Sequence, residues 1–122
     1  MKLVRYGKPG KEKPGLIDAE GKLRDLSKEL KDIGPAQLGD AALAKIAKLN
    51  TAKLPLVKGK PRMGSPVAHV GKFIAIGLNY ADHAAESGLP IPEEPVVFMK
   101  ATSALSGPND PILKPRGSTQ LD

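Results

Sequence analysis

The sequence predicts an α+β fold, with a small mixed N-terminal domain followed by the first strands of a mixed β-sheet domain. Apolar residues occur mostly in short runs that suit strands, and only a few stretches have helical spacing. Glycine and proline supply 25 of the 122 residues, which favours short elements and frequent turns over a helical bundle. Only four residues are aromatic, so the core is expected to consist of Leu, Ile, Val and Ala.

The first 26 residues predict a small sheet. Residues 2–6 have the composition of a strand, and Lys8-Pro9-Gly10 ends it. Residues 15–17 and 22–26 flank the turn-rich segment 18–21, and this arrangement predicts a hairpin.

Two helices are expected next. Ser27 is placed to cap a short helix over 27–33, which Gly34-Pro35 would stop. A second helix is expected over 40–49, followed by Asn50 in the left-handed conformation that often ends a helix.

The composition changes after the second helix. Residues 54–66 are rich in lysine, proline and glycine, and we interpret them as a linker at the end of the small domain. The expected division is therefore a domain of residues 1–66 and the beginning of a second domain over 67–122.

The second part alternates strand and helix patterns. Buried strands are expected over 72–77 and 96–99, where short β-rich apolar runs occur. A helix is expected over 80–87, an extended proline-rich loop over 90–95, and the start of a further strand at 112–113.

Composition excludes several classes of protein. Without cysteine there is no disulfide, thiolate metal site or cysteine nucleophile. No apolar run approaches the length of a membrane span, and the N-terminus lacks the apolar stretch of a signal peptide, so we expect a cytoplasmic protein without a membrane partner. Residues 1–66 carry a net charge of +8 and residues 67–122 a net charge of −2. Because the lysines of the first part are interspersed with acids and lack aromatic neighbours, we expect no nucleic-acid partner, with a basic nucleic-acid binder kept as an alternative.

One stretch is rich in chemically useful side chains. His83 and Glu86 are three residues apart on the expected helix, so they share one face. A carboxylate beside an imidazole fixes its tautomer and raises its basicity, as a general base requires. The alternative is an exposed pair that only steadies a short helix. His69, the other histidine, has no partner at a telling spacing.

Residues 73–86 resemble the first catalytic motif of the fumarylacetoacetate hydrolase family. Further matching segments follow at 94–100, 103–104, 107–108, 115–118 and 121–122. The opening segments 2–7 and 12–16 resemble the small N-terminal domain of a bacterial branch of that family. Members of this branch act on ureidoglycolate, on diketo-deoxy sugar acids or on oxo-heptene-dioates.

The resemblance implies a metal-dependent enzyme, usually a homodimer, that cleaves a small oxo-acid. Family members hold Mg²⁺ or Mn²⁺ through three carboxylates, two of them in a Glu-x-Glu motif beyond the position of Leu121-Asp122. The 122 residues stop before this motif, so we assign no metal ligand and expect no cofactor for the chain alone.

The resemblance also assigns site residues. His83 and Glu86 match the catalytic dyad of the family, which activates water in the hydrolytic members. Asn79, Tyr80, Lys100 and Ser103 match positions that line the same cleft, where substrate binding and a structural role are both open. Two alternatives to a hydrolase or lyase remain. One is an isomerase, decarboxylase or hydratase on a 2-oxo acid, and the other is an inactive remnant that only binds or oligomerises.

Overall fold

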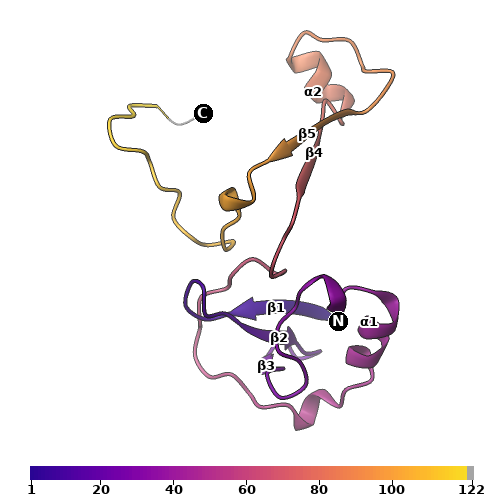
Figure 1. Cartoon of the computed structure of the whole chain (residues 1–122), viewed down its shortest axis with the longest axis vertical. Coiled ribbons are helices and arrows are strands. Elements are labelled where there is room, and N and C mark those ends of the chain that lie inside the picture. The colour runs from indigo at the N-terminus through magenta and orange to yellow at the C-terminus, as the bar shows by residue number, and fades with distance from the viewer. Residues whose placement is uncertain (121–122) are drawn as a thin grey trace. The chain divides into compact units, whose positions relative to one another are not determined.

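The computed structural model describes residues 1–120, which form two compact units (Figure 1). One unit consists of Met1–Ala68 together with the residues from Ser106 onward, and the other is His69–Leu105. Both units combine strands with helices, and the predicted α+β class is confirmed. The expected domain boundary after residue 66 stays a prediction, because the two units are defined by contacts within these residues and not by separate folding. Leu121 and Asp122, which contribute to the family resemblance, lie outside the described residues.

A three-stranded antiparallel sheet organises the N-terminal unit. Its strands are β1 (Lys2–Tyr6), β2 (Lys13–Ile17) and β3 (Leu23–Asp25), with β2 in the centre. The pairs Tyr6↔Lys13 and Ile17↔Leu23 fix the register of the two hairpins. The predicted first strand and the predicted hairpin are therefore confirmed.

Aliphatic side chains form the core of this unit. Leu16, Leu26, Ile46 and Leu54 are buried and pack in one cluster, with Leu26 fully excluded from solvent. Ile46 comes from helix α1 (Asp40–Ala47), which therefore contributes one buried side chain to the core. Each fully buried aliphatic side chain of this kind stabilises a fold by about 1.5–3 kcal/mol.

The short helix predicted over 27–33 is wrong. Residues 27–29 form a single turn, in which the amides of Glu29 and Leu30 donate to the Leu26 carbonyl. Asp25, not Ser27, acts as the side-chain acceptor, taking the Ser27 amide at 2.6 Å. Seven residues are too few for a helix to form on propensity alone, and here other contacts fix the segment. The 3-10 helix η1 (Pro35–Gln37) follows.

The end of the second predicted helix also differs. Helix α1 ends at Ala47, and Asn50 has an extended backbone with φ −75° and ψ 99°. Instead of closing the first helix, the Asn50 side chain accepts the Ala52 amide and begins the 3-10 helix η2 (Thr51–Lys53). Asparagine is favoured at both kinds of helix end, and the sequence does not distinguish them.

Residues 54–66, which the composition predicts to be a linker, lie along both edges of the sheet. On the β3 side, the Asp25 amide donates to the Pro55 carbonyl and the Val57 amide to the Leu23 carbonyl, each at 2.9 Å. On the β1 side, the Gly64 amide donates to the Arg5 carbonyl at 2.8 Å. The segment therefore supplies backbone partners to strands whose outer edges would otherwise be exposed.

The second unit is built on a two-stranded antiparallel ribbon. Strands β4 (Phe73–Gly77) and β5 (Val96–Lys100) pair along their full length, and helix α2 (Ala81–Glu86) lies in the connection between them. The 3-10 helix η3 (Thr102–Ala104) follows β5. These strands and this helix confirm the predictions made for 72–77, 96–99 and 80–87.

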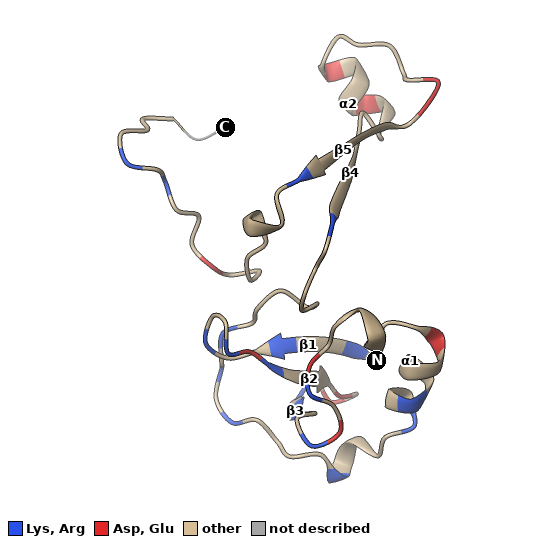
Figure 2. Cartoon of the chain, in the orientation of Figure 1, with Lys and Arg blue, Asp and Glu red and all other residues tan. Residues whose placement is uncertain are grey.

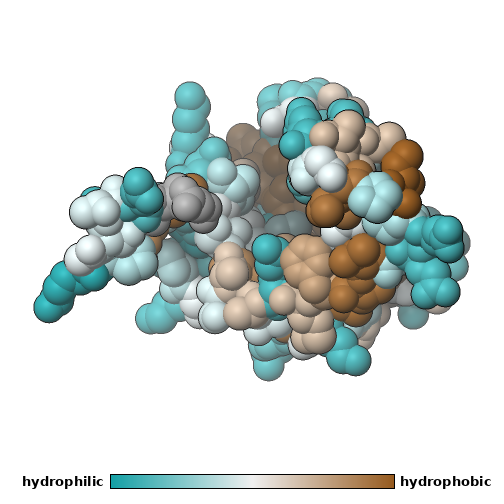
Figure 3. Space-filling view, turned by 90° about the horizontal axis from the view of Figure 1, so that it is seen from above, coloured by the Kyte–Doolittle hydropathy of each residue, from teal (hydrophilic) through white to brown (hydrophobic). Residues whose placement is uncertain are grey.

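The burial predicted for these two strands is wrong. Every residue of β5 is exposed, and so are Phe73, Ile74 and Ile76 of β4. Within residues 1–120 the two strands pair only with each other. Figure 3 shows hydrophobic side chains at the surface of the protein. The strand expected at 112–113 is also absent from the described residues, and Ile112 and Leu113 are 87% and 83% exposed.

Three carboxylates of the N-terminal unit give it a defined pH dependence. Hydrogen bonds from Arg62 lower the pKa of Glu12 and of Asp110, and a hydrogen bond from Arg24 lowers the pKa of Asp18. A carboxyl whose pKa is lower in the folded state stabilises the fold above its unfolded pKa, about 4. This stabilisation is lost as the pH falls through the folded pKa.

We therefore expect the melting temperature to change little between about pH 7 and pH 5 and to fall steeply below about pH 4. Thermal unfolding followed by circular dichroism measures it. The variant Asp18→Asn should have a shallower acid slope than the unmodified protein. A melting temperature that is constant down to about pH 2.5 would contradict the expectation.

Candidate functional site

The candidate site is built on the connection between β4 and α2. Strand β4 ends at Gly77, and Leu78 then adopts the left-handed conformation with φ 47°. A bulky residue in this conformation costs about 1–3 kcal/mol, and such residues concentrate at functional sites. The chain returns to an extended conformation at Tyr80, the N-cap of α2, with φ −121° and ψ 134°.

Helix α2 is short but has a well-formed C-terminus. The Leu89 amide donates to the Ala84 carbonyl at 3.0 Å, and the Gly88 amide donates to the Ala85 carbonyl at 3.1 Å. Gly88 has φ 63°, which glycine adopts without strain, and these two bonds together form a Schellman motif. Only Ala84 of this helix is buried, so the remaining side chains of α2 face solvent.

The structure brings His83 and Glu86 to the same side of α2 without pairing them. The two residues are three positions apart on one helix, which places their side chains on neighbouring turns. Both are exposed, and within residues 1–120 no hydrogen bond or ion pair joins them. Hydrogen bonds between catalytic groups often form only when substrate binds, and the assignment of the dyad stays a prediction.

The predicted binding residues fall at two ends of the ribbon. Asn79 and Tyr80 immediately precede α2, and Tyr80 is 69% exposed. Lys100 pairs with Phe73, whereas α2 follows the opposite end of the ribbon, where Gly77 pairs with Val96. Lys100 is four positions after Val96 on β5, about 13 Å away at about 3.3 Å per residue. Ser103 lies beyond Lys100, in η3, and is exposed. Their shared role in one substrate site stays a prediction.

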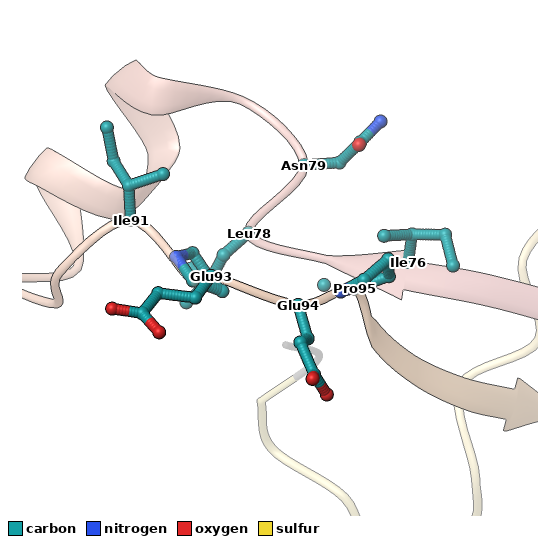
Figure 4. Close-up of a pocket in the computed structure, with 9 residues that line it drawn as sticks. Ile76, Leu78, Asn79, Ile91, Glu93, Glu94 and Pro95 are labelled. Atoms are coloured by element: carbon teal, nitrogen blue, oxygen red, sulfur yellow. The ribbon is translucent and has the colours of Figure 1, made fainter.

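An open pocket of about 390 Å³ lies beside the left-handed turn. It is lined by residues 76–79 at the end of β4 and by residues 91–95 of the proline-rich loop. Figure 4 shows the Glu93 and Glu94 carboxylates projecting in different directions, with the Asn79 side chain turned away from both. Sequence reasoning did not assign Glu93 or Glu94 to a site. The sequence indicates only that these two glutamates lie in an extended loop, because Pro92 precedes them and Pro95 follows them.

The carboxylates described here do not fit a magnesium site. Magnesium requires nearly octahedral oxygen ligands at close range. Among residues 1–120, no group of three acidic or histidine side chains comes close enough together to hold a metal ion. The Glu93 and Glu94 side chains, which diverge, illustrate why. No ligand set is therefore assigned to these residues.

Lys100 lies over an aromatic ring. Its Nζ atom is 5.0 Å from the centre of the Phe98 ring, a distance at which the ammonium group is attracted to the ring face. The two residues are two positions apart on β5 and therefore lie on the same face of the ribbon. The Lys100 ammonium group is thus positioned by its own strand, with no carboxylate paired to it within the described residues.

Comparison with known proteins places the candidate site inside a family match. Residues 72–122 match the family model described as "Fumarylacetoacetate (FAA) hydrolase C-terminal". Two curated proteins named "Putative hydrolase", from Burkholderia cenocepacia and Burkholderia multivorans, are each 59% identical over all 122 residues. The chain spans 43% of the length of each of these relatives.

A solved structure extends the comparison to the fold. The crystal structure titled as that of a putative HpcE protein from Mycobacterium smegmatis aligns with a TM-score of 0.72 and 32% sequence identity. The alignment covers 97% of this chain and 42% of the HpcE chain. Separately, no helix within residues 1–120 combines the length and the hydropathy that a membrane span needs.

Proposed function

Because the chain belongs to the fumarylacetoacetate hydrolase family, we propose that the whole protein is an enzyme that cleaves a small oxo-acid. The observation that carries the proposal is the placement of His83 and Glu86 on the exposed side of α2, directly after the left-handed turn at Leu78. This helix lies inside the segment that matches the family model. The chain spans 43% of the length of its curated relatives, and the proposal concerns the whole protein.

In the proposed mechanism, His83 acts as the general base. Its neutral imidazole removes a proton from water, and the resulting hydroxide adds to a carbonyl carbon of the substrate. The neighbouring carbon–carbon bond then breaks, and its electron pair passes into an enolate that takes up the proton held by His83. Glu86 orients the imidazole and stabilises its charged form. Asn79 and Tyr80, at the start of α2, contribute contacts to the substrate.

The remaining features of the proposal rest on the family resemblance. They are a Mg²⁺ or Mn²⁺ ion held by carboxylates other than those described here, and assembly of the whole protein as a homodimer.

The reaction is tested by incubating the purified whole protein with a 2,4-dioxo acid, with ureidoglycolate and with a simple 2-oxo acid. A carboxylic acid and a shorter 2-oxo acid formed from the dioxo acid, identified by mass spectrometry, would support cleavage. A product with unchanged mass or with loss of CO₂ would instead identify an isomerase or a decarboxylase.

A metal titration provides a further prediction. A polypeptide of residues 1–122 should show no rise in melting temperature with millimolar Mg²⁺ or Mn²⁺, because a ligand stabilises a fold only where a folded site binds it. Within the described part of the chain the carboxylates do not converge on such a site. Differential scanning fluorimetry measures the effect, with the whole protein as the positive control. A clear metal-dependent rise in the shorter polypeptide would show that the described carboxylates form a metal site.

A further inference from the structure

Arg62 is the centre of an ion-pair network in the N-terminal unit. Its Nε and Nη2 atoms donate to the two carboxylate oxygens of Asp110, each at 2.6 Å. Its Nη1 atom donates to Glu12 Oε1 at 2.8 Å and to the Gly7 carbonyl at 3.2 Å. The Arg62 side chain is 27% exposed, and those of Glu12 and Asp110 are 10% and 19% exposed. A planar guanidinium group that binds a carboxylate through two parallel bonds restricts both position and orientation.

Asp110 in turn closes a tight turn. Its Oδ2 atom accepts the Gly107 amide at 2.7 Å, and its own amide donates to the Gly107 carbonyl at 3.1 Å. Gly107 is buried, and a Cβ atom at this position would lie 2.1 Å from the Met63 carbonyl oxygen. The backbones at Met63 and Gly107 are therefore in direct contact, and only glycine fits there.

The Arg62 end of the network is anchored on the sheet. The Gly7 amide donates to the Arg62 carbonyl at 2.9 Å, and Met63 forms a bridge with Tyr6. The charged residues that carry these contacts are coloured in Figure 2. The segment at Met63, shortly before the chain leaves the N-terminal unit after Ala68, thus meets the returning chain at Gly107 beside β1.

We propose that Arg62 is a positioning residue that clamps together, at the edge of β1, the two segments of the N-terminal unit that flank the unit His69–Leu105. The paired bonds to Asp110 hold the returning chain, and the bonds to Glu12 and Gly7 hold Arg62 itself. The clamp restricts the motion of these two flanking segments relative to each other. Its significance for catalysis rests on the proposed function, because α2 and its dyad lie on the unit that these segments flank.

Amide hydrogen exchange of the whole protein tests the clamp. The variant Arg62→Met keeps the length of the side chain and removes its donors. We expect exchange at the Gly107 and Asp110 amides to become about tenfold faster, because these amides are held by the turn that Arg62 fixes. The control is Arg24→Met, which removes the single hydrogen bond and ion pair between Arg24 and Asp18 and leaves the returning chain untouched. It should not change exchange at Gly107 or Asp110.

A kinetic measurement separates the clamp from the proposed reaction. With a substrate that the unmodified protein turns over, Arg62→Met should lower kcat severalfold with KM within about twofold, and Arg24→Met should change neither when assayed well below its melting temperature. The clamp would be overturned if Arg62→Met left amide exchange at Gly107 and Asp110 unchanged, or if Arg24→Met accelerated it equally. Unchanged kcat in Arg62→Met would overturn it as well. Absence of turnover in the unmodified protein would contradict the proposed function, and exchange alone would then decide the clamp. If Arg62→Met does not fold, Arg62→Lys keeps the positive charge, removes the paired bonds to Asp110 and carries the same expectations.

Discussion

Replacement of His83 by alanine should lower kcat of the whole protein by about 10²–10⁴, the range for a positioned acid–base group. His83 lies on the exposed side of α2, and no other histidine is available on that helix to take its place. The melting temperature should hardly change, because the His83 side chain is exposed and makes no hydrogen bond or ion pair within residues 1–120. Steady-state kinetics and thermal unfolding of the same preparation measure both quantities.

Glu86→Gln and the double variant complete this experiment. If Glu86 acts only by orienting His83, the double variant should lose little more activity than His83→Ala alone, because either change disables the same proton transfer. The matched control is His69→Asn, which removes the other histidine. Asparagine tolerates the left-handed conformation that His69 adopts, with φ 54°. Near-normal kcat for His83→Ala would show that the pair only steadies a short helix. An equal loss for the His69 control would show that the loss of activity is not specific to His83.

Local sequence patterns were sufficient for elements whose signals lie within a few residues. Short apolar runs next to glycine or proline predict strands β1, β4 and β5, and helical spacing predicts helix α2. The same local reasoning failed at 27–33. There, long-range contacts such as the ion pair between Arg5 and Asp32 at 2.7 Å, rather than helix propensity, fix the chain.

Burial could not be predicted from the strands themselves. An apolar run such as that of β5 has the same composition whether a second layer covers it or not, and here it is exposed. The Arg62 network escaped prediction for a related reason. Its partners are separated by 48 to 50 residues in sequence, and no spacing rule connects an arginine to carboxylates at such distances.

Some features of the candidate site can be predicted from the sequence, and others depend on the fold. The positions of His83 and Glu86 on one helix follow from their spacing of three residues, and the structure shows that helix. The left-handed conformation of Leu78 and the pocket formed with the 91–95 loop depend on how two separate segments meet. Such features become accessible only when the fold is known.

The stability of the N-terminal unit should depend most strongly on Leu26. This side chain is fully buried, and it packs with Leu16, Ile46 and Leu54, which come from a strand, a helix and the segment along the sheet edge. Truncation to alanine leaves a cavity where these three elements meet, and such truncations cost about 2–5 kcal/mol. Because small domains are stable by only about 5–15 kcal/mol, the variant should lose a large part of its free energy of unfolding.

Urea unfolding of Leu26→Ala, Leu26→Met and Leu56→Ala measures this dependence. Methionine nearly conserves the side-chain volume, and its cost should stay below about 1.5 kcal/mol. Leu56 is 50% exposed, and its truncation should cost well under half as much as that of Leu26, because less apolar surface leaves contact with the protein. A similar cost at Leu26 and Leu56 would show that the cluster around Leu26 is not the core of the unit. Since the Arg62 clamp is anchored on β1 of this unit, Leu26→Ala should also accelerate exchange at Gly107, whereas Arg62→Met should leave exchange in the core unchanged.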